Sequence, residues 1–149
     1  MAVSRRLALL APLLLPAVSR AQAAEPVAIR GAWARAAGQG QGSSGAYMTL
    51  TAREPLTLLG AESSAAGIIE IHQMKLEGDV MKMRAVDTLS LPVGQPVEFK
   101  PGGYHFMLMD LKAPFRPGTR VPLTLRLRDA RGRPRTVQLS LPVAAAPPP

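Results

Sequence analysis

Short apolar stretches that alternate with polar residues run along most of this chain, and proline and glycine separate them. An alternation of period two is typical of half-buried β-strands, and closely spaced turn residues favour an all-β sandwich or barrel. We therefore expect one all-β domain. The ranges that we expect to form strands are Val27 to Arg35, Ala46 to Thr51, Leu56 to Ala61, Gly67 to Lys75, Val80 to Val86, Val97 to Phe99, Tyr104 to Leu111, Val121 to Asp129 and Thr136 to Val143.

The connections between these strands follow from composition. The segment AAGQGQGSS at residues 36–44 has the glycine and serine content of a loop, and so have residues 87–96, which contain two prolines. We expect the strand at 56–61 to pair with the strand at 46–51. Glu77-Gly78-Asp79 is a hairpin signal that would join residues 67–75 to residues 80–86.

The first residues of the chain have the composition of a secretory signal peptide. A positive start with Arg5 and Arg6 precedes an apolar stretch from Leu7 to Val18, which is too short to span a membrane. Small residues follow, so we expect cleavage after Ala23 or Ala24. The expected organisation is a signal peptide at 1–23, a β-domain at 25–143 and a disordered Ala/Pro tail at 144–149. The mature chain would have no membrane span and would lie in the periplasm.

Charge and cysteine content exclude several classes of protein. The formal net charge is +8, with 18 basic and 10 acidic residues, and it falls to +5 without the three arginines of the signal peptide. Aromatic residues that could stack on bases are few, so we expect no nucleic-acid partner. The chain has no cysteine, which excludes disulfides, thiolate zinc sites and blue-copper electron-transfer sites.

Both histidines of the protein lie in the range from Ile71 to Leu111, together with five of its seven methionines. Imidazole nitrogen and thioether sulfur are ligands that suit copper, and thioethers favour Cu(I). A methionine-rich strand pair can equally be core packing. Strand alternation places the candidate ligands on shared faces, which hold Glu70, His72 and Met74 on one strand, Met81 and Met83 on the next, and His105, Met107 and Met109 on a third.

The spacing of these residues resembles the signature of the periplasmic copper chaperone family PCu(A)C. His72 is followed after ten residues by Met83, and after twenty-one more by His105 and Met107 in the pattern His-x-Met. Further segments are similar to the family, namely Gly31-Ala32-Trp33-Ala34-Arg35, Gly45-Ala46-Tyr47-Met48-Thr49, Lys100-Pro101-Gly102-Gly103-Tyr104-His105 and Val121-Pro122-Leu123-Thr124-Leu125. The resemblance covers essentially all of the chain after the signal peptide.

This resemblance implies a cupredoxin-like Greek-key β-sandwich that binds one Cu(I) per chain through His72, Met83, His105 and Met107. It also implies a monomer that delivers copper to the CuA centre of cytochrome c oxidase, alongside thioredoxin-fold copper chaperones. Gln73 stands where the family often has methionine, and the tail lacks the histidines and methionines of a second site. We interpret Met74, Met81 and Met109 as packing around the site, and Glu70 as a candidate hydrogen-bond acceptor for His72.

Other functions remain open at this point. A copper sequestration or resistance protein could use the same residues for storage, and a structural or adhesive sandwich could have a methionine-rich core without binding copper. We find no nucleophile and base arranged for catalysis, and both histidines are already assigned to the metal. We therefore expect that the protein is not an enzyme.

Overall fold

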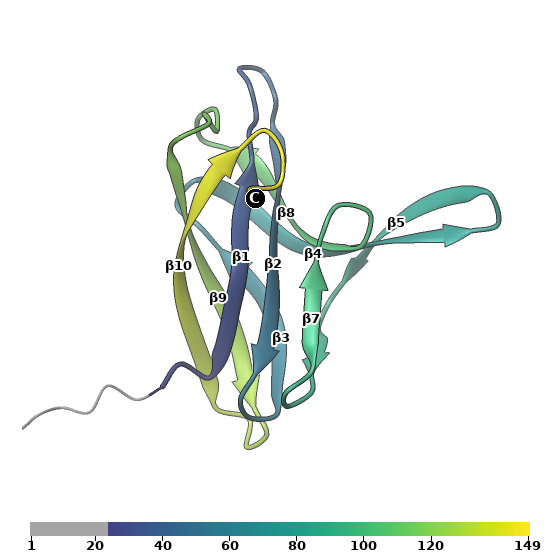
Figure 1. The fold of residues 1–149 in the computed structure, drawn as a ribbon, viewed down its shortest axis with the longest axis vertical. Helices are drawn as coiled ribbons and strands as arrows, with labels where there is room; N and C mark the ends of the chain where they lie inside the picture. Colours follow the sequence, from purple (N-terminus) through teal and green to yellow (C-terminus); the bar gives the residue numbers. More distant parts are fainter. Residues whose placement is uncertain (1–23) are drawn as a thin grey trace, which may run out of the picture.

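The computed structural model describes residues 24–149, in which the regular structure consists of ten β-strands (Figure 1). The predicted signal peptide at 1–23 lies outside the described residues. The strands are β1 (Val27–Arg35), β2 (Ser43–Ala52), β3 (Leu56–Glu62), β4 (Ala66–Glu77), β5 (Val80–Val86), β6 (Leu89–Leu91), β7 (Pro96–Phe99), β8 (Tyr104–Leu111), β9 (Arg120–Asp129) and β10 (Pro134–Ala144). No helix in residues 24–149 is long and apolar enough to cross a bilayer.

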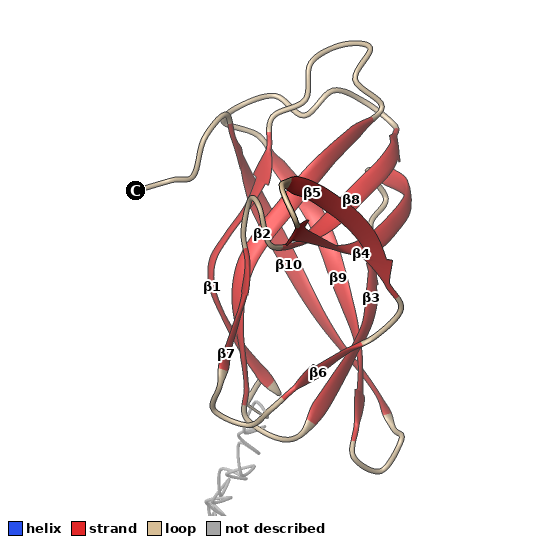
Figure 2. Cartoon of the chain, turned by 90° about the vertical axis from the view of Figure 1, so that its right-hand side faces the viewer, coloured by secondary structure: helices blue, strands red, loops and turns tan. Residues whose placement is uncertain are grey.

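Hydrogen bonds connect the strands in the order β5-β4-β8-β7-β2-β1-β10-β9-β3-β6. The contact between β1 and β10 is short and parallel, with Ala34 opposite Val143 and Arg35 opposite Ala144. At this contact the sheet folds over, so that β9, β10 and β3 form a second layer against β1 and β2 (Figure 2). The predicted all-β sandwich with one domain is confirmed.

The core lies between the two layers, and strand alternation explains which residues enter it. Along β9 the side chains at every second position are buried, namely Val121, Leu123, Leu125 and Leu127. Residues of the facing layer complete this core, among them Met48, Leu50 and Phe106, which are at most 2% exposed. Removing this apolar surface from water is the main stabilising contribution in a chain without disulfides.

Three details of the predicted arrangement are wrong. Strand β2 begins at Ser43, so the predicted loop at 36–44 is shorter. Strand β3 pairs with β9 and β6 rather than with β2, because it lies in the other layer. Strand β6 lies inside the predicted loop at 87–96, where Leu91 is buried against β3. Such a short strand is stabilised by its tertiary neighbours rather than by its own sequence pattern.

The hairpin of β4 and β5 extends beyond the body of the sandwich (Figure 1). Strand β8 begins at Tyr104, opposite Gln73, and the part of β4 that follows Gln73 pairs with β5 alone. The turn uses Gly78 at a φ of 64°, a backbone conformation that glycine adopts without steric cost. The predicted hairpin is therefore confirmed, and its outer half has solvent on both faces.

Candidate metal centre

The two histidines face each other at the base of this hairpin. His72 of β4 is the direct antiparallel partner of His105 of β8, and their ring centroids lie 5.6 Å apart in an edge-to-face arrangement. Opposed residues in an antiparallel pair project from the same side of the sheet. The strand pairing thus brings together two residues that are 33 positions apart in the sequence.

One ring nitrogen of His72 has no partner within residues 24–149. The Nε2 atom of His72 lies 2.7 Å from Oε2 of Glu70, a geometry in which Nε2–H donates to the carboxylate. Its Nδ1 is buried and has no hydrogen-bond partner among the described residues. A buried polar atom without a partner is unfavourable, and a histidine that binds a metal commonly donates its other ring nitrogen to a carboxylate. The Nδ1 lone pair is therefore available for a metal ion.

His105 is held in the form that metals require. It is 5% exposed, and its Nδ1 donates to the carbonyl oxygen of Gly103 at 3.2 Å, which leaves the Nε2 lone pair free. Burial lowers the pKa of His105, and the nearby His72 and Arg35 act in the same direction, while the bond to Gly103 opposes them. Because the neutral imidazole is the ligand form, a lowered pKa favours metal binding near neutral pH.

A cavity of about 280 Å³ lies beside these rings. Three of the four predicted ligands, Met83, His105 and Met107, line it directly. His72 is not among the lining residues, but its ring centroid lies 5.6 Å from that of His105. The other residues that line the cavity are Arg35, Ser43, Ser44, Gly45, Tyr47, Met74, Pro101 and Gly102. The structure thus brings the predicted ligands together from three strands, β4, β5 and β8.

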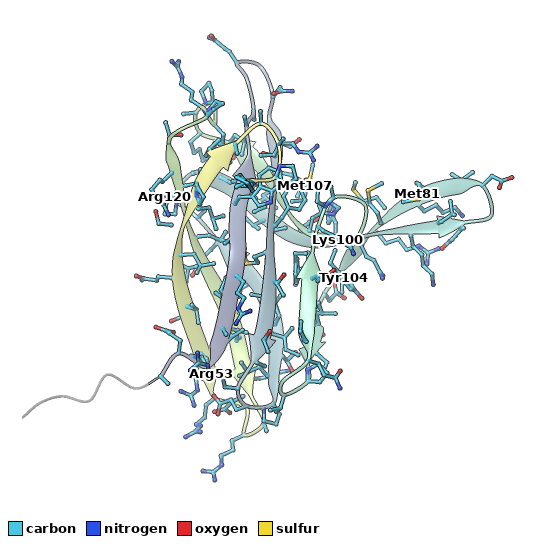
Figure 3. All side chains as sticks on the ribbon, viewed as in Figure 1. Arg53, Met81, Lys100, Tyr104, Met107 and Arg120 are labelled. Atoms are coloured by element: carbon cyan, nitrogen blue, oxygen red, sulfur yellow. The ribbon has the colours of Figure 1, made fainter. Side chains whose placement is uncertain are left out.

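The methionines that we interpreted as packing differ in position. Met74 lies directly opposite Met83 and lines the cavity with it, so it offers a third thioether there. Met81 lies farther out on the hairpin and is 47% exposed, and Figure 3 shows it well away from Met107. Met109 does not line the cavity either. The register of the hairpin turn was the signal that could have distinguished Met74 from Met81.

The structure places at the site an aromatic residue and a cation for which the sequence pattern indicated no role there. Tyr47 lies with its ring centroid 6.5 Å from that of His105 and packs on Trp33 at 4.8 Å. The guanidinium carbon of Arg35 lies 5.5 Å from the centre of the Tyr47 ring. These residues belong to the segments at 31–35 and 45–49, whose similarity to a known family was the only sequence signal for them.

The donor set of this cavity is chemically distinctive. Within residues 24–149 no group of three or more His, Cys, Asp or Glu could hold a metal ion. The cavity is lined by His105 and by the thioethers of Met74, Met83 and Met107. Such a set of neutral nitrogen and sulfur ligands suits a soft ion such as Cu(I) and offers little to calcium or magnesium. Fold and site together define a β-sandwich protein with a candidate soft-metal centre.

Comparison with known proteins identifies the family of this chain. The model of the family described as "Putative lipoprotein LpqE-like" matches residues 27–143, and the chain belongs to this family. A lipoprotein of Leifsonia xyli subsp. xyli, named "Putative lipoprotein Lxx21020", is 33% identical over 112 residues, which are 74% of this chain and 68% of the relative. The uncharacterized protein RP573 of Rickettsia prowazekii is 35% identical over 122 residues, 78% of this chain and 64% of its own length.

Solved structures show the same fold. The apo PCuAC domain from PmoF1 has a TM-score of 0.64 at 20% identity and covers 81% of this chain and 95% of its own. Apo-DR1885 from Deinococcus radiodurans has a TM-score of 0.61 at 28% identity, over 98% of this chain and 97% of its own. The Cu(I) form of DR1885 has a TM-score of 0.59 at 28% identity and covers 85% of this chain and 82% of its own. The fold is therefore that of PCuAC domains.

Proposed function

We propose that this protein is a periplasmic metallochaperone that binds one Cu(I) per chain through His72, Met83, His105 and Met107. The observation that carries the proposal is the unpartnered, buried Nδ1 of His72, whose ring lies 5.6 Å from that of His105, in a protein where His105, Met83 and Met107 line one cavity. A histidine that only packed in the core would have both ring nitrogens satisfied. The solved Cu(I) form of DR1885, a chain of similar fold, supports the same conclusion.

The geometry also suits a carrier that has to release its ion. All four ligands are neutral, so the bound ion keeps its positive charge and attracts an anionic ligand from an acceptor. Met83 is 48% exposed, which gives an incoming ligand access to the site. Oε2 of Glu70 lies 2.7 Å from Nε2 of His72, and this contact keeps the orientation of the imidazole ring while the ion is exchanged.

The destination that we propose is the CuA centre of cytochrome c oxidase, in cooperation with thioredoxin-fold copper chaperones. This part of the proposal is supported by the similarity of fold to PCuAC domains and by the family resemblance of the sequence. Thiolates bind Cu(I) more strongly than thioethers do, so transfer to a cysteine-containing acceptor should run downhill. A storage protein would retain its ion under the same conditions.

The location and the domain organisation that we propose follow from the composition of the sequence. Residues 1–23 would direct export and be removed, residues 25–143 would form the copper-binding domain, and residues 144–149 would be a tail without its own copper ligands. The description of the matching family as a lipoprotein family supports a location in the cell envelope. We propose that the mature protein acts as a monomer and not as an enzyme.

Two measurements test this function. A competitive titration of the protein with Cu(I) and a chromogenic chelator should give one ion per chain. The Cu(I)-loaded protein is then mixed with an excess of the reduced, metal-free CuA domain, and copper is followed after the two are separated. Copper should move to the CuA domain; copper that stays on this protein at equilibrium would favour sequestration over delivery.

A further inference from the structure

The hairpin beyond the metal site has one apolar face, whose outer part is exposed. Leu76 lies opposite Met81, and Met74 lies opposite Met83, so all four side chains project from one side of the hairpin. Leu76 is 61% exposed, and Met81 and Met83 are 47% and 48% exposed. We call Met74, Leu76, Met81 and Met83 the hairpin strip. The strip begins at the cavity, to which Met74 and Met83 belong, and runs outward.

The opposite face of the same hairpin carries most of its charged side chains. Glu77 forms ion pairs with Lys82, at 2.9 Å, and with Arg84. Exposure to solvent is therefore favourable for the charged face of the hairpin and unfavourable for its apolar face. Large exposed apolar residues gathered on one face mark interaction sites, and methionine side chains adapt to the shape of a partner.

The side chain of Arg35 lies at the same cavity and has no ion pair within residues 24–149. Arg35 is exposed at the end of β1 and lines the cavity with Met83 and His105. Its guanidinium packs over Tyr47 and forms no ion pair with any carboxylate of residues 24–149. An unpaired arginine on an aromatic ring is well placed to receive a carboxylate from another molecule, because its donors are already oriented.

We propose that the hairpin strip and Arg35 together form the docking surface for the protein that accepts the copper. The partner would be an acidic protein that lays an apolar patch on the strip and places a carboxylate on Arg35, with its metal ligands over the cavity between them. The inference rests on the proposed function, because it assigns a face to the acceptor of that copper. Docking on the strip aligns the acceptor's ligands with Met83 and Met107 before the ion moves.

Self-association is the main alternative, and charge opposes it. Strand β5 is an edge of the sheet, and it carries Lys82 and Arg84 with exposed side chains. Charged residues on an edge strand hinder pairing with another edge. Without the three arginines of the signal peptide the formal net charge is +5, so two copies repel each other, while an acidic partner is attracted.

The test compares copper transfer by matched variants to the reduced, metal-free CuA domain. The double variant Leu76→Thr/Met81→Thr removes the outer strip and leaves every residue that lines the cavity. Val80→Thr is the control, because Val80 is 58% exposed on the charged face of the same hairpin and the change is nearly isosteric. Arg35→Gln removes the cation. Cu(I) affinity and oligomeric state are measured for each variant beside the second-order rate of transfer.

We expect the double variant to bind Cu(I) like the wild type but to transfer it at least about tenfold more slowly, a loss equivalent to about 1.4 kcal/mol. Val80→Thr should transfer at the wild-type rate, and Arg35→Gln should reduce the dependence of the rate on salt concentration. Undiminished transfer by the double variant would overturn the docking surface and leave the copper site intact. If the wild type were a dimer and the double variant a monomer, the hairpin strip would be a self-association surface. That result would also overturn the docking surface. Failure of the wild type to bind Cu(I) would refute the proposed function itself.

Discussion

His72 and His105 are direct cross-strand partners, and this pairing decides the geometry of the metal centre. Side chains alternate along a strand, so a shift of β4 by one residue would turn His72 to the other face of the sheet. The buried residues Ile71 of β4 and Phe106 of β8, themselves opposite each other, fix the register because a shift would expose them. The core of the sandwich therefore also positions the ligands.

The methionines should differ in their effect on copper binding. We expect Met83→Leu and Met107→Leu to weaken Cu(I) binding at least about tenfold, because the sulfur is lost while the volume is nearly kept. Met74→Leu should have a smaller effect, since Met74 lines the cavity but lies outside the predicted ligand set. Competition with a chelator measures each affinity.

Met109→Leu is the matched control for this series, because Met109 lies on β8 two positions beyond Met107 and does not line the cavity. Its Cu(I) affinity should equal that of the wild type. Equal losses in all four variants would indicate a diffuse methionine cluster rather than a defined site.

Glu70 should act as a positioning residue for His72. We expect Glu70→Gln to lower Cu(I) affinity about tenfold, because a carboxylate that accepts from a ligating histidine orients the ring and strengthens its donor nitrogen. Glu98→Gln is the control, since Glu98 pairs with Lys100 two positions away on an exposed surface. An unchanged affinity of Glu70→Gln would show that the contact is incidental. The NMR shifts of the His72 ring would report its tautomer independently.

The preference of the site for Cu(I) or Cu(II) provides a separate check of the ligand set. We expect one Cu(I) per chain and weaker binding of Cu(II), because thioethers suit the softer ion. Titration with each ion under matched conditions measures both affinities, with reductant present for Cu(I) only. Tighter binding of Cu(II) at this cavity would exclude Met83 and Met107 as ligands.

Asp129 should make the fold sensitive to acid. Burial alone would raise the pKa of Asp129, but the backbone N–H groups of Arg133 and Arg131 and the Arg133 side chain donate to its carboxylate and lower the pKa to about 2. The ordinary value is 3.8. The carboxylate thus stabilises the fold above about pH 4, and this contribution is lost as the pH falls toward 2.

Asp129→Asn should therefore lower the free energy of unfolding at pH 7 and flatten its decrease between pH 4 and pH 2. Chemical denaturation followed by circular dichroism over this range measures both effects. An identical pH profile in the variant and the wild type would contradict the assigned role. Asp79→Asn, in the exposed hairpin turn, is the control and should leave the profile unchanged.

Local patterns in the sequence were sufficient to predict most strands and the hairpin turn at Gly78. These features depend on alternation and on turn residues, which act over a few positions. The spacing of His72, Met83, His105 and Met107 indicated the candidate ligands through its resemblance to a family signature, and their neutral nitrogen and sulfur donors suit a soft metal.

Tertiary structure alone decided how these parts meet. The partner of β3, the existence of β6 and the entry of Met74 into the cavity depend on contacts between segments far apart in the chain. Likewise, no local pattern indicated that Arg35 would reach the cavity from β1, or that the charges around the late turn would converge on Asp129. The physical reason is that burial and layer packing select one pairing among many that local propensity permits.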